Sequence, residues 1–343
     1  MKELTIGGSP HIKGSNTTKR IMIDVLIALL PASIVGILFF GYKALIIICV
    51  SVLSAIATEI VYKLCIKKSF KEIYEEFDFT SAITGLLIGL CMPPLVNWYI
   101  PIFASVFAVA VVKMLFGGTG KNLVNPAIVG RIFVALSFGI VLNGFAEPLI
   151  IGAGNFFEND ALTQLISGAT PLTQMIGSDV AVMPDNLQLF LGNIPGTIGE
   201  TSTLALLVGG IYLSIRKVID FRFPLIYICV TGLISVLLYN FNFAYFLPSI
   251  LSGGLMIGAI FMATDYTTSP NSFWGNIIYF SALGLLTAIL RFFTGTEVVS
   301  YVILLMNLTV PLIDKYVFPK PFGYVKEKKV SNKNIGVNME VKK

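Results

Sequence analysis

Long uninterrupted blocks of apolar residues are the feature of this sequence that most limits its possible folds. Apolar residues make up 55% of the 343 residues and charged residues only 13%, about half of the charged share that a soluble domain needs to cover its surface. The blocks are continuous, unlike the one-sided stripes of amphipathic helices. This pattern excludes a soluble α/β enzyme and predicts an all-α polytopic membrane protein.

Ten of these blocks are long enough to cross a hydrocarbon core, which takes about 20 apolar residues. The third block is expected to be bent or half-length, because Pro93 and Pro94 interrupt it. The expected spans are residues 21–40, 44–65, 80–97, 98–116, 123–144, 199–215, 223–240, 246–264, 273–291 and 298–314.

Basic residues indicate which side of the membrane each connection occupies. With ten spans all basic clusters fall on one face, which the positive-inside rule makes cytoplasmic, together with both termini. Residues 139–215 contain no Lys or Arg, so the loop within them lies outside the cytoplasm. The expected organisation is a cytoplasmic segment (1–20), a first transmembrane repeat (21–144), an extracytoplasmic loop (145–198), a second repeat (199–314) and a basic cytoplasmic tail (315–343).

The two halves of the chain resemble each other. Residues 115–126 read LFGGTGKNLVNP and residues 260–270 read IFMATDYTTSP, each between two spans. Thr80 opens the run TSAITGLLIGL, and Thr201 opens TSTLALLVGG. Gly, Thr and Pro are common in membrane helices, so chance is one explanation. The matching positions favour two inverted five-helix repeats, whose interrupted segments converge on a central site.

The metal-ligating residue types are sparse. Cys49, Cys65, Cys91 and Cys229 are scattered and form no CxxC pair, and His11 is the only histidine. These residues argue against an iron–sulfur or zinc site within the chain and against a bis-histidine haem, so no metal site is expected. An organic cofactor is therefore the expected carrier if the protein handles electrons. We expect membrane lipid to surround the protein and expect no nucleic acid to bind it.

The segment Ser167-Gly168-Ala169-Thr170-Pro171-Leu172-Thr173 lies in the extracytoplasmic loop. Thr followed by Pro is an ordinary helix start, with Thr170 as N-cap. The same geometry leaves a sterically open hydroxyl that a phosphate could esterify at a helix N-terminus. The residues alone leave both interpretations open.

This motif, together with FGGTGKNLVNPAIVGR at 116–131 and FMATDYTTSP at 261–270, resembles the RnfD/NqrB family of membrane flavoprotein subunits. The resemblance covers most of the chain. It implies that Thr170, the last residue of the Ser167-Gly168-Ala169-Thr170 motif, carries FMN through a phosphoester bond made by a flavin transferase. Gln164 stands where that motif often has an acidic residue, which bears on the efficiency of attachment.

The resemblance also implies a second, non-covalent flavin (riboflavin) in the membrane domain. Asn122, Asn125 and Asp265 lie in the paired loops, whose turn-forming residues also have a purely structural explanation. Side chains facing each other across the repeat interface could hydrogen-bond a flat polar ring. We therefore expect this flavin between these three residues.

The function implied is that of a subunit, not active alone, of an ion-translocating ferredoxin:NAD+ oxidoreductase in a prokaryotic plasma membrane, coupled to Na+ or H+. Its implied partners are the other Rnf subunits, including an extracytoplasmic flavoprotein subunit. The B subunit of a Na+-translocating NADH:quinone reductase is the alternative within the family, and the N-terminal segment of about twenty residues favours Rnf. A flavin-free inverted-repeat channel or carrier for a small polar solute is the alternative outside it.

Four charged residues lie within or at the edge of expected spans, where a charge costs about 2.5–3.5 kcal/mol. Arg291 is expected to snorkel outward. Arg131 is expected near the cytoplasmic end of its span, where snorkelling competes with contact to a flavin or a partner. Asp24 and Glu59 are either acids on an ion path or paired structural carboxylates.

Overall fold

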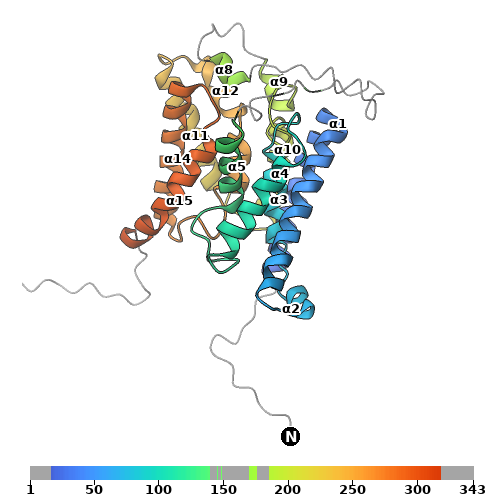
Figure 1. Cartoon of the computed structure of the whole chain (residues 1–343). Coiled ribbons are helices and arrows are strands. Elements are labelled where there is room, and N and C mark those ends of the chain that lie inside the picture. Colours follow the sequence, from blue (N-terminus) through green and yellow to red (C-terminus); the bar gives the residue numbers. More distant parts are fainter. Residues whose placement is uncertain (1–16, 140–144, 146–147, 149–169, 176–184, 318–343) are drawn as a thin grey trace, which may run out of the picture.

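The computed structural model describes residues 17–139, 145, 148, 170–175 and 185–317, and these ranges contain helices and connections but no β-strand. The helices form one bundle (Figure 1). In chain order they are α1 (Thr18–Cys65), α2 (Phe70–Glu75), α3 (Thr80–Leu90), α4 (Ile100–Val106), η1 (Phe107–Met114), α5 (Pro126–Ser137), α8 (Pro171–Met175), α9 (Asn186–Leu191), α10 (Thr203–Ile215), α11 (Arg222–Leu238), η3 (Phe243–Tyr245), α12 (Phe246–Leu251), α13 (Leu255–Ile257), η4 (Gly258–Met262), α14 (Phe273–Thr294) and α15 (Val299–Tyr316).

Three of the described helices, α1, α14 and α15, are each long and apolar enough to cross a membrane. A further candidate span is bent, because Phe243–Leu251 and Leu255–Met262 meet at 66°. The shorter apolar helices are Thr80–Leu90, Ile100–Met114, Pro126–Ser137, Thr203–Ile215 and Arg222–Leu238. The apolar all-α architecture is as expected, while the count of ten crossings stays a prediction.

Several spans differ from their expected extents. The first two expected spans both lie within α1 and are separated by a kink at Gly41, as predicted; the φ of 70° there favours glycine. The third stops at Leu90 before its prolines, as expected. The fifth is shorter than predicted, since α5 ends at Ser137. The eighth expected span (246–264) is not one straight helix, because the chain turns between α12 and α13 where Gly253 has a φ of 67°.

The loops separate to opposite ends of the bundle. Figure 1 shows α2 at one end and α8 and α9 at the other. The basic cluster around α2 therefore lies far from Thr170, as the charge distribution predicts. Which end faces the cytoplasm remains a prediction.

Glycines allow α1 and α3 to pack closely. A Cβ on Gly85 of α3 would lie 2.7 Å from the Ser51 carbonyl oxygen of α1 and 2.8 Å from the Val52 Cα. The Ser51 hydroxyl donates to the Gly85 carbonyl at 2.6 Å and lies 3.0 Å from the Ser105 hydroxyl of α4. Small residues and interhelical hydrogen bonds stabilise helix pairs in lipid, where the hydrophobic effect contributes little.

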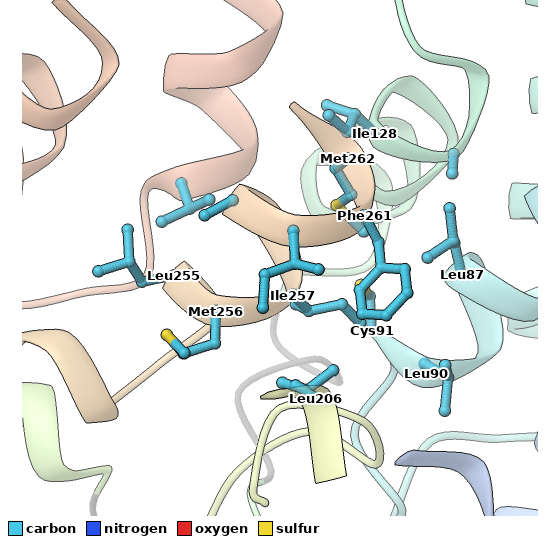
Figure 2. Close-up of a cluster of buried hydrophobic side chains, with 14 of the residues drawn as sticks. Leu87, Leu90, Cys91, Ile128, Leu206, Leu255, Met256, Ile257, Phe261 and Met262 are labelled. Atoms are coloured by element: carbon cyan, nitrogen blue, oxygen red, sulfur yellow. The ribbon is translucent and has the colours of Figure 1, made fainter. Parts of the chain in front are cut away.

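The bent segment occupies the centre of the bundle. Figure 2 shows Ile257 and Phe261 of this segment near Leu87 of α3 and Leu206 of α10. Ile257 and Leu206 are 1% and 0% exposed. At the break between α12 and α13, Ser252 and Gly254 are buried and Gly253 is half-buried. Irregular backbone is tolerated at membrane depth where protein encloses it or where it lines a cavity.

The two similar loops have the same structural context. Each follows a π-helix, η1 or η4, and each leads into a helix whose first turn is capped by a side chain. Asn125 accepts from the Ala127 amide at the start of α5, and Ser272 accepts from the Gly275 amide at the start of α14. This parallel supports the predicted repeat.

Replacing Gly85 by Val is expected to destabilise the bundle by about 1–3 kcal/mol, because the new side chain overlaps the α1 backbone. A lower melting temperature of the detergent-solubilised protein would show this. Gly139→Val is the matched control, since nothing lies within 4 Å of a Cβ at that position. Equal melting temperatures for the two variants would contradict the close α1–α3 contact.

Candidate functional site

A cavity of about 690 Å³ opens near the end of the bundle that carries α8 and α9. Its volume lies within the roughly 300–1,000 Å³ of typical ligand pockets. Both halves of the chain contribute to its wall, and we call it the outer cavity. Its lining includes Cys91, Met92, Pro93, Arg131, Ile132, Ala135, Gly139, Phe145, Thr170, Pro171, Leu172, Thr173, Ile194, Pro195, Gly196, Thr197, Glu200, Thr201, Gly253, Thr296, Glu297, Ser300 and Tyr301.

Thr170 lies on this wall directly before α8. Its carbonyl oxygen accepts from the amides of Thr173 and Gln174 at 3.0 and 3.3 Å, so the helix begins at Pro171, as the sequence predicts. The Thr170 hydroxyl is 3.4 Å from the Thr173 hydroxyl, which donates to the Thr170 carbonyl at 2.7 Å. Thr170 therefore combines a helix start with a place on the cavity wall. Ser167, Gly168 and Ala169 lie outside the described residues.

Arg131 of α5 reaches the same cavity. One terminal nitrogen of its guanidinium lies 3.0 Å from Glu200 Oε1, and the other donates to the Ser300 hydroxyl at 2.9 Å. Of the two alternatives left open for Arg131, snorkelling or an internal contact, the structure therefore favours the internal contact. Glu200 precedes α10, and its carboxylate lies inside the bundle. Because the Arg131 guanidinium has this partner, it does not need to extend to the membrane surface to be solvated.

Arg291 is also paired inside the bundle. It lies 2.8 Å from Glu297 Oε2 and donates to the Ser249 carbonyl at 2.9 Å, and its side chain is only 7% exposed. The prediction that Arg291 snorkels outward is wrong, because Glu297 in the α14–α15 connection folds back over it. The same carboxylate accepts from the Gly254 amide at 2.9 Å.

The glycines of the helix break lie between these two ion pairs. A Cβ on Gly254 would lie 2.6 Å from Glu200 Oε1 and 3.6 Å from an Arg131 nitrogen. On Gly253 it would meet Glu297 Oε2 and lie 2.8 Å from an Arg291 nitrogen. Only glycine leaves room for the charged groups here. The helix break and the two ion pairs therefore form adjoining parts of the wall of the outer cavity.

A second, smaller cavity of about 120 Å³ lies where the two paired loops meet, and we call it the inner cavity. The structure brings the three predicted residues Asn122, Asn125 and Asp265 to its wall. Lys113 and Thr119 from the first half also line it, beside apolar residues of α3, α10 and η4. The sequence prediction that these loops converge is therefore correct.

Most of the polar groups at the inner cavity already have partners in the protein. Asn122 donates to the Thr267 hydroxyl at 3.1 Å, and Asn125 donates to the Met262 carbonyl at 3.2 Å. Asp265 accepts from the Thr267 hydroxyl at 2.9 Å. Desolvation raises the pKa of Asp265 above its ordinary value, against the lowering effect of these hydrogen bonds. The three residues thus join the two loops to each other.

Beside the inner cavity lies a buried ionic cluster that sequence reasoning missed. A basic residue near the end of a span usually flanks the membrane, yet Lys113 is 3% exposed and lies 3.1 Å from Glu59 Oε2. Glu59 also pairs with Lys63 at 2.7 Å and accepts from the Ser81 hydroxyl. The i,i+4 spacing of Glu59 and Lys63 was the available signal. The paired, structural interpretation of Glu59 is the one that the structure favours.

Asp24 and Asp78 have partners as well. Asp24 lies 3.1 Å from Arg216 and accepts from Tyr212 at 3.0 Å, so it is also a paired carboxylate. Asp78 accepts from the Thr119 hydroxyl at 2.6 Å. Burial alone would raise the pKa of Asp78, but the hydrogen bonds and the nearby Lys113 charge outweigh it and lower that pKa.

Asn307 of α15 is a further buried polar residue that sequence reasoning missed, and it is 0% exposed. With its amide oriented to satisfy every neighbour, it donates to Tyr279 at 2.7 Å and to the Thr268 carbonyl at 3.2 Å. It then accepts from the Asn125 amide at 3.2 Å. One side chain therefore connects α14, α15 and both paired loops.

Comparison with known proteins shows relatives along nearly the whole chain. Residues 5–323 match the NQR2, RnfD, RnfE family. The chain is 38% identical to the D subunit of the Na(+)-translocating ferredoxin:NAD(+) oxidoreductase complex of Acetobacterium woodii, over 95% of this chain and 97% of that protein. It is 34% identical to the D subunit of the proton-translocating ferredoxin:NAD(+) oxidoreductase complex of Clostridium ljungdahlii, over 93% and 96%. It is also 32% identical to the D subunit of the ion-translocating oxidoreductase complex of Stutzerimonas stutzeri, over 90% and 93%. The family and the apolar helices together confirm the predicted multi-pass membrane class.

Arg291→Met is expected to cost about 3–5 kcal/mol of stability, because it leaves the Glu297 carboxylate buried without its cation. The double variant Arg291→Met/Glu297→Leu should recover part of that loss. Thermal melting in detergent measures both effects. Arg222→Met is the matched control, since Arg222 is 78% exposed and 3.8 Å from Asp220. A single variant at Arg291 that melts like the parent would contradict a structural role for the pair.

Proposed function

Because the chain belongs to the NQR2, RnfD, RnfE family, we propose that it is the D subunit of an ion-translocating ferredoxin:NAD+ oxidoreductase complex in a prokaryotic plasma membrane. We propose further that it carries FMN through a phosphoester on Thr170. Its partners would be the other members of the complex, including an extracytoplasmic flavoprotein subunit. A flavin transferase would attach the FMN during maturation.

The position of Thr170 carries this proposal. Its hydroxyl stands on the wall of a cavity of about 690 Å³, which is large enough for a drug-sized or cofactor-sized ligand. That wall has both apolar and charged side chains. Leu172 and Ile132 are apolar, and Arg131 and Glu200 form an ion pair. A flavin has an apolar ring edge and a polar ring edge, so the residues present fit such a group.

When bound, FMN would supply reversible electron uptake, chemistry that no side chain here supplies. The chain's own part is to position the cofactor. Thr170 would tether it, and Pro171 fixes the direction of the chain at the tether. The glycines of the break, Gly253 and Gly254, leave room on the cavity wall for the charged groups of Glu297 and Glu200.

The second flavin is a separate proposal with weaker support. The paired loops bring Asn122, Asn125 and Asp265 together, as that proposal requires. The inner cavity of about 120 Å³ is smaller than the roughly 300 Å³ of the smallest typical ligand pockets. As the loops stand, riboflavin does not fit there, and no electron step is assigned to it.

The B subunit of a sodium-translocating NADH:quinone reductase is the alternative within the family. The relatives above favour the Rnf assignment, because a D subunit is matched over 97% of its own length. A passive channel, the alternative outside the family, would leave Thr170 unmodified.

Thr170→Val is expected to abolish flavin fluorescence of the chain on a denaturing gel after co-expression with the flavin transferase, because Val offers no oxygen for a phosphoester. The membrane yield should not change, since the side-chain shape is similar. Thr173→Val is the matched control, because it removes the neighbouring hydroxyl 3.4 Å away on the same wall. Thr173→Val should keep the fluorescence.

Absence of fluorescence from the parent chain would refute covalent attachment and favour the channel alternative. Fluorescence that survives in Thr170→Val would move the attachment site to another residue. Mass analysis of the peptide that contains Thr170 distinguishes these outcomes.

A further inference from the structure

We propose that Arg131 and Glu200 face the ring of the flavin attached at Thr170 and shift its reduction potential in opposite directions. The inference rests on the proposed function and names the residues that act on the cofactor. Neither the family nor the names of the relatives assign a role to these two residues.

The first observation is that the pair belongs to the same cavity as the tether. Arg131 comes from α5, Glu200 from the connection before α10 and Thr170 from the start of α8, and all three line the outer cavity. The Arg131 side chain is 15% exposed and the Glu200 side chain 6% exposed, so both charges lie in a poorly solvated setting. A ligand in this cavity would meet both charges with little water to screen them.

The second observation is unused hydrogen-bonding capacity on this wall. A guanidinium has five N–H donors; within the described residues, Arg131 donates one to the Ser300 hydroxyl and pairs with Glu200 by charge. Thr201 is 1% exposed, and its hydroxyl has no hydrogen-bond partner in the described part of the chain. Glu200 Oε1 forms an ion pair with Arg131, but it accepts no hydrogen bond of good geometry from the described residues. An unsatisfied buried polar group costs about 1–3 kcal/mol, which a bound polar edge would recover.

The chemistry of this wall complements the polar edge of an isoalloxazine ring. That edge presents a carbonyl, an N–H and a second carbonyl in a row. Arg131 can donate to a carbonyl oxygen, and the Glu200 carboxylate can accept from the N–H. A mainly apolar solute would leave these groups without partners.

Charge determines the expected sign of each effect. Uptake of two electrons and one proton leaves one negative charge on a flavin ring. The Arg131 cation favours that charge and the Glu200 anion opposes it, while the intact pair largely cancels. Removing the cation should therefore make the flavin harder to reduce, and removing the anion should make it easier to reduce.

The experiment uses the full chain co-expressed with the flavin transferase, so that its own flavin is the only one present. The purified protein is titrated with dithionite, and flavin absorbance reports the reduced fraction. Arg131→Gln should shift the reduction equilibrium about tenfold toward the oxidised form, which is about 30 mV for a two-electron couple. Glu200→Gln, which keeps the shape of the side chain, should shift it about tenfold the other way.

Two further variants separate a local charge effect from a structural one. Arg131→Lys keeps the positive charge, so its flavin should have a reduction potential close to that of the parent. If Arg131→Gln does not accumulate in the membrane, Arg131→Lys and Glu200→Gln together still test the inference. Arg216→Gln removes the cation of the Asp24 ion pair, which does not line the outer cavity, and should leave the potential unchanged.

If the reduction potential shifts in the same direction in Arg131→Gln and Glu200→Gln, or shifts in neither, the inference is overturned. The proposed function would still stand, provided that the flavin stays attached on a denaturing gel. A parent chain with no gel-stable flavin would overturn the proposed function and this inference together.

Discussion

Charged groups inside this bundle depend on partners, because hydrocarbon offers neither water nor counterions to solvate them. The pairs Arg131–Glu200 and Arg291–Glu297 satisfy that requirement at the outer cavity. The Arg131–Glu200 pair joins segments that are far apart in the chain, and the Arg291–Glu297 pair joins α14 to the connection that follows it. Both pairs lie against the glycines of the break between α12 and α13. The wall of the outer cavity is therefore held in place by electrostatic pairing as well as by apolar packing.

The broken helix links this wall to the rest of the molecule. Its inner half, α13 and η4, packs against α3 and α10 at the centre of the bundle (Figure 2). Its end leads into the loop that carries Asp265 and that bonds to Asn122 through Thr267. A single segment thus contacts the outer cavity at one end and the inner cavity at the other. This continuity offers a physical connection between a cofactor site and the loops at the far end of the bundle.

Much of the fold could be predicted from local patterns. The apolar blocks placed most helices within a few residues, and Thr170-Pro171 marked a helix start that the structure confirms. The convergence of the paired loops followed from their matching positions in two halves. The sequence did not predict the ion pairs of Lys113 and Arg131, whose carboxylates come from segments far away in the chain, which no local pattern contains. The prediction for Arg291 was wrong although Glu297 lies only six residues further on, because the fold of the connection after α14 decides that contact.

The sequence by itself determined the apolar, multi-pass class of this chain and the approximate positions of most helices, because these properties follow from composition and local patterns. The candidate hydroxyl for flavin attachment came from the resemblance to a family. Only the tertiary structure decided which charges pair, where the central helix breaks and which residues share a cavity with Thr170. Those properties come from contacts between distant segments, since a buried charge adopts the position in which a carboxylate, a carbonyl or a hydroxyl reaches it.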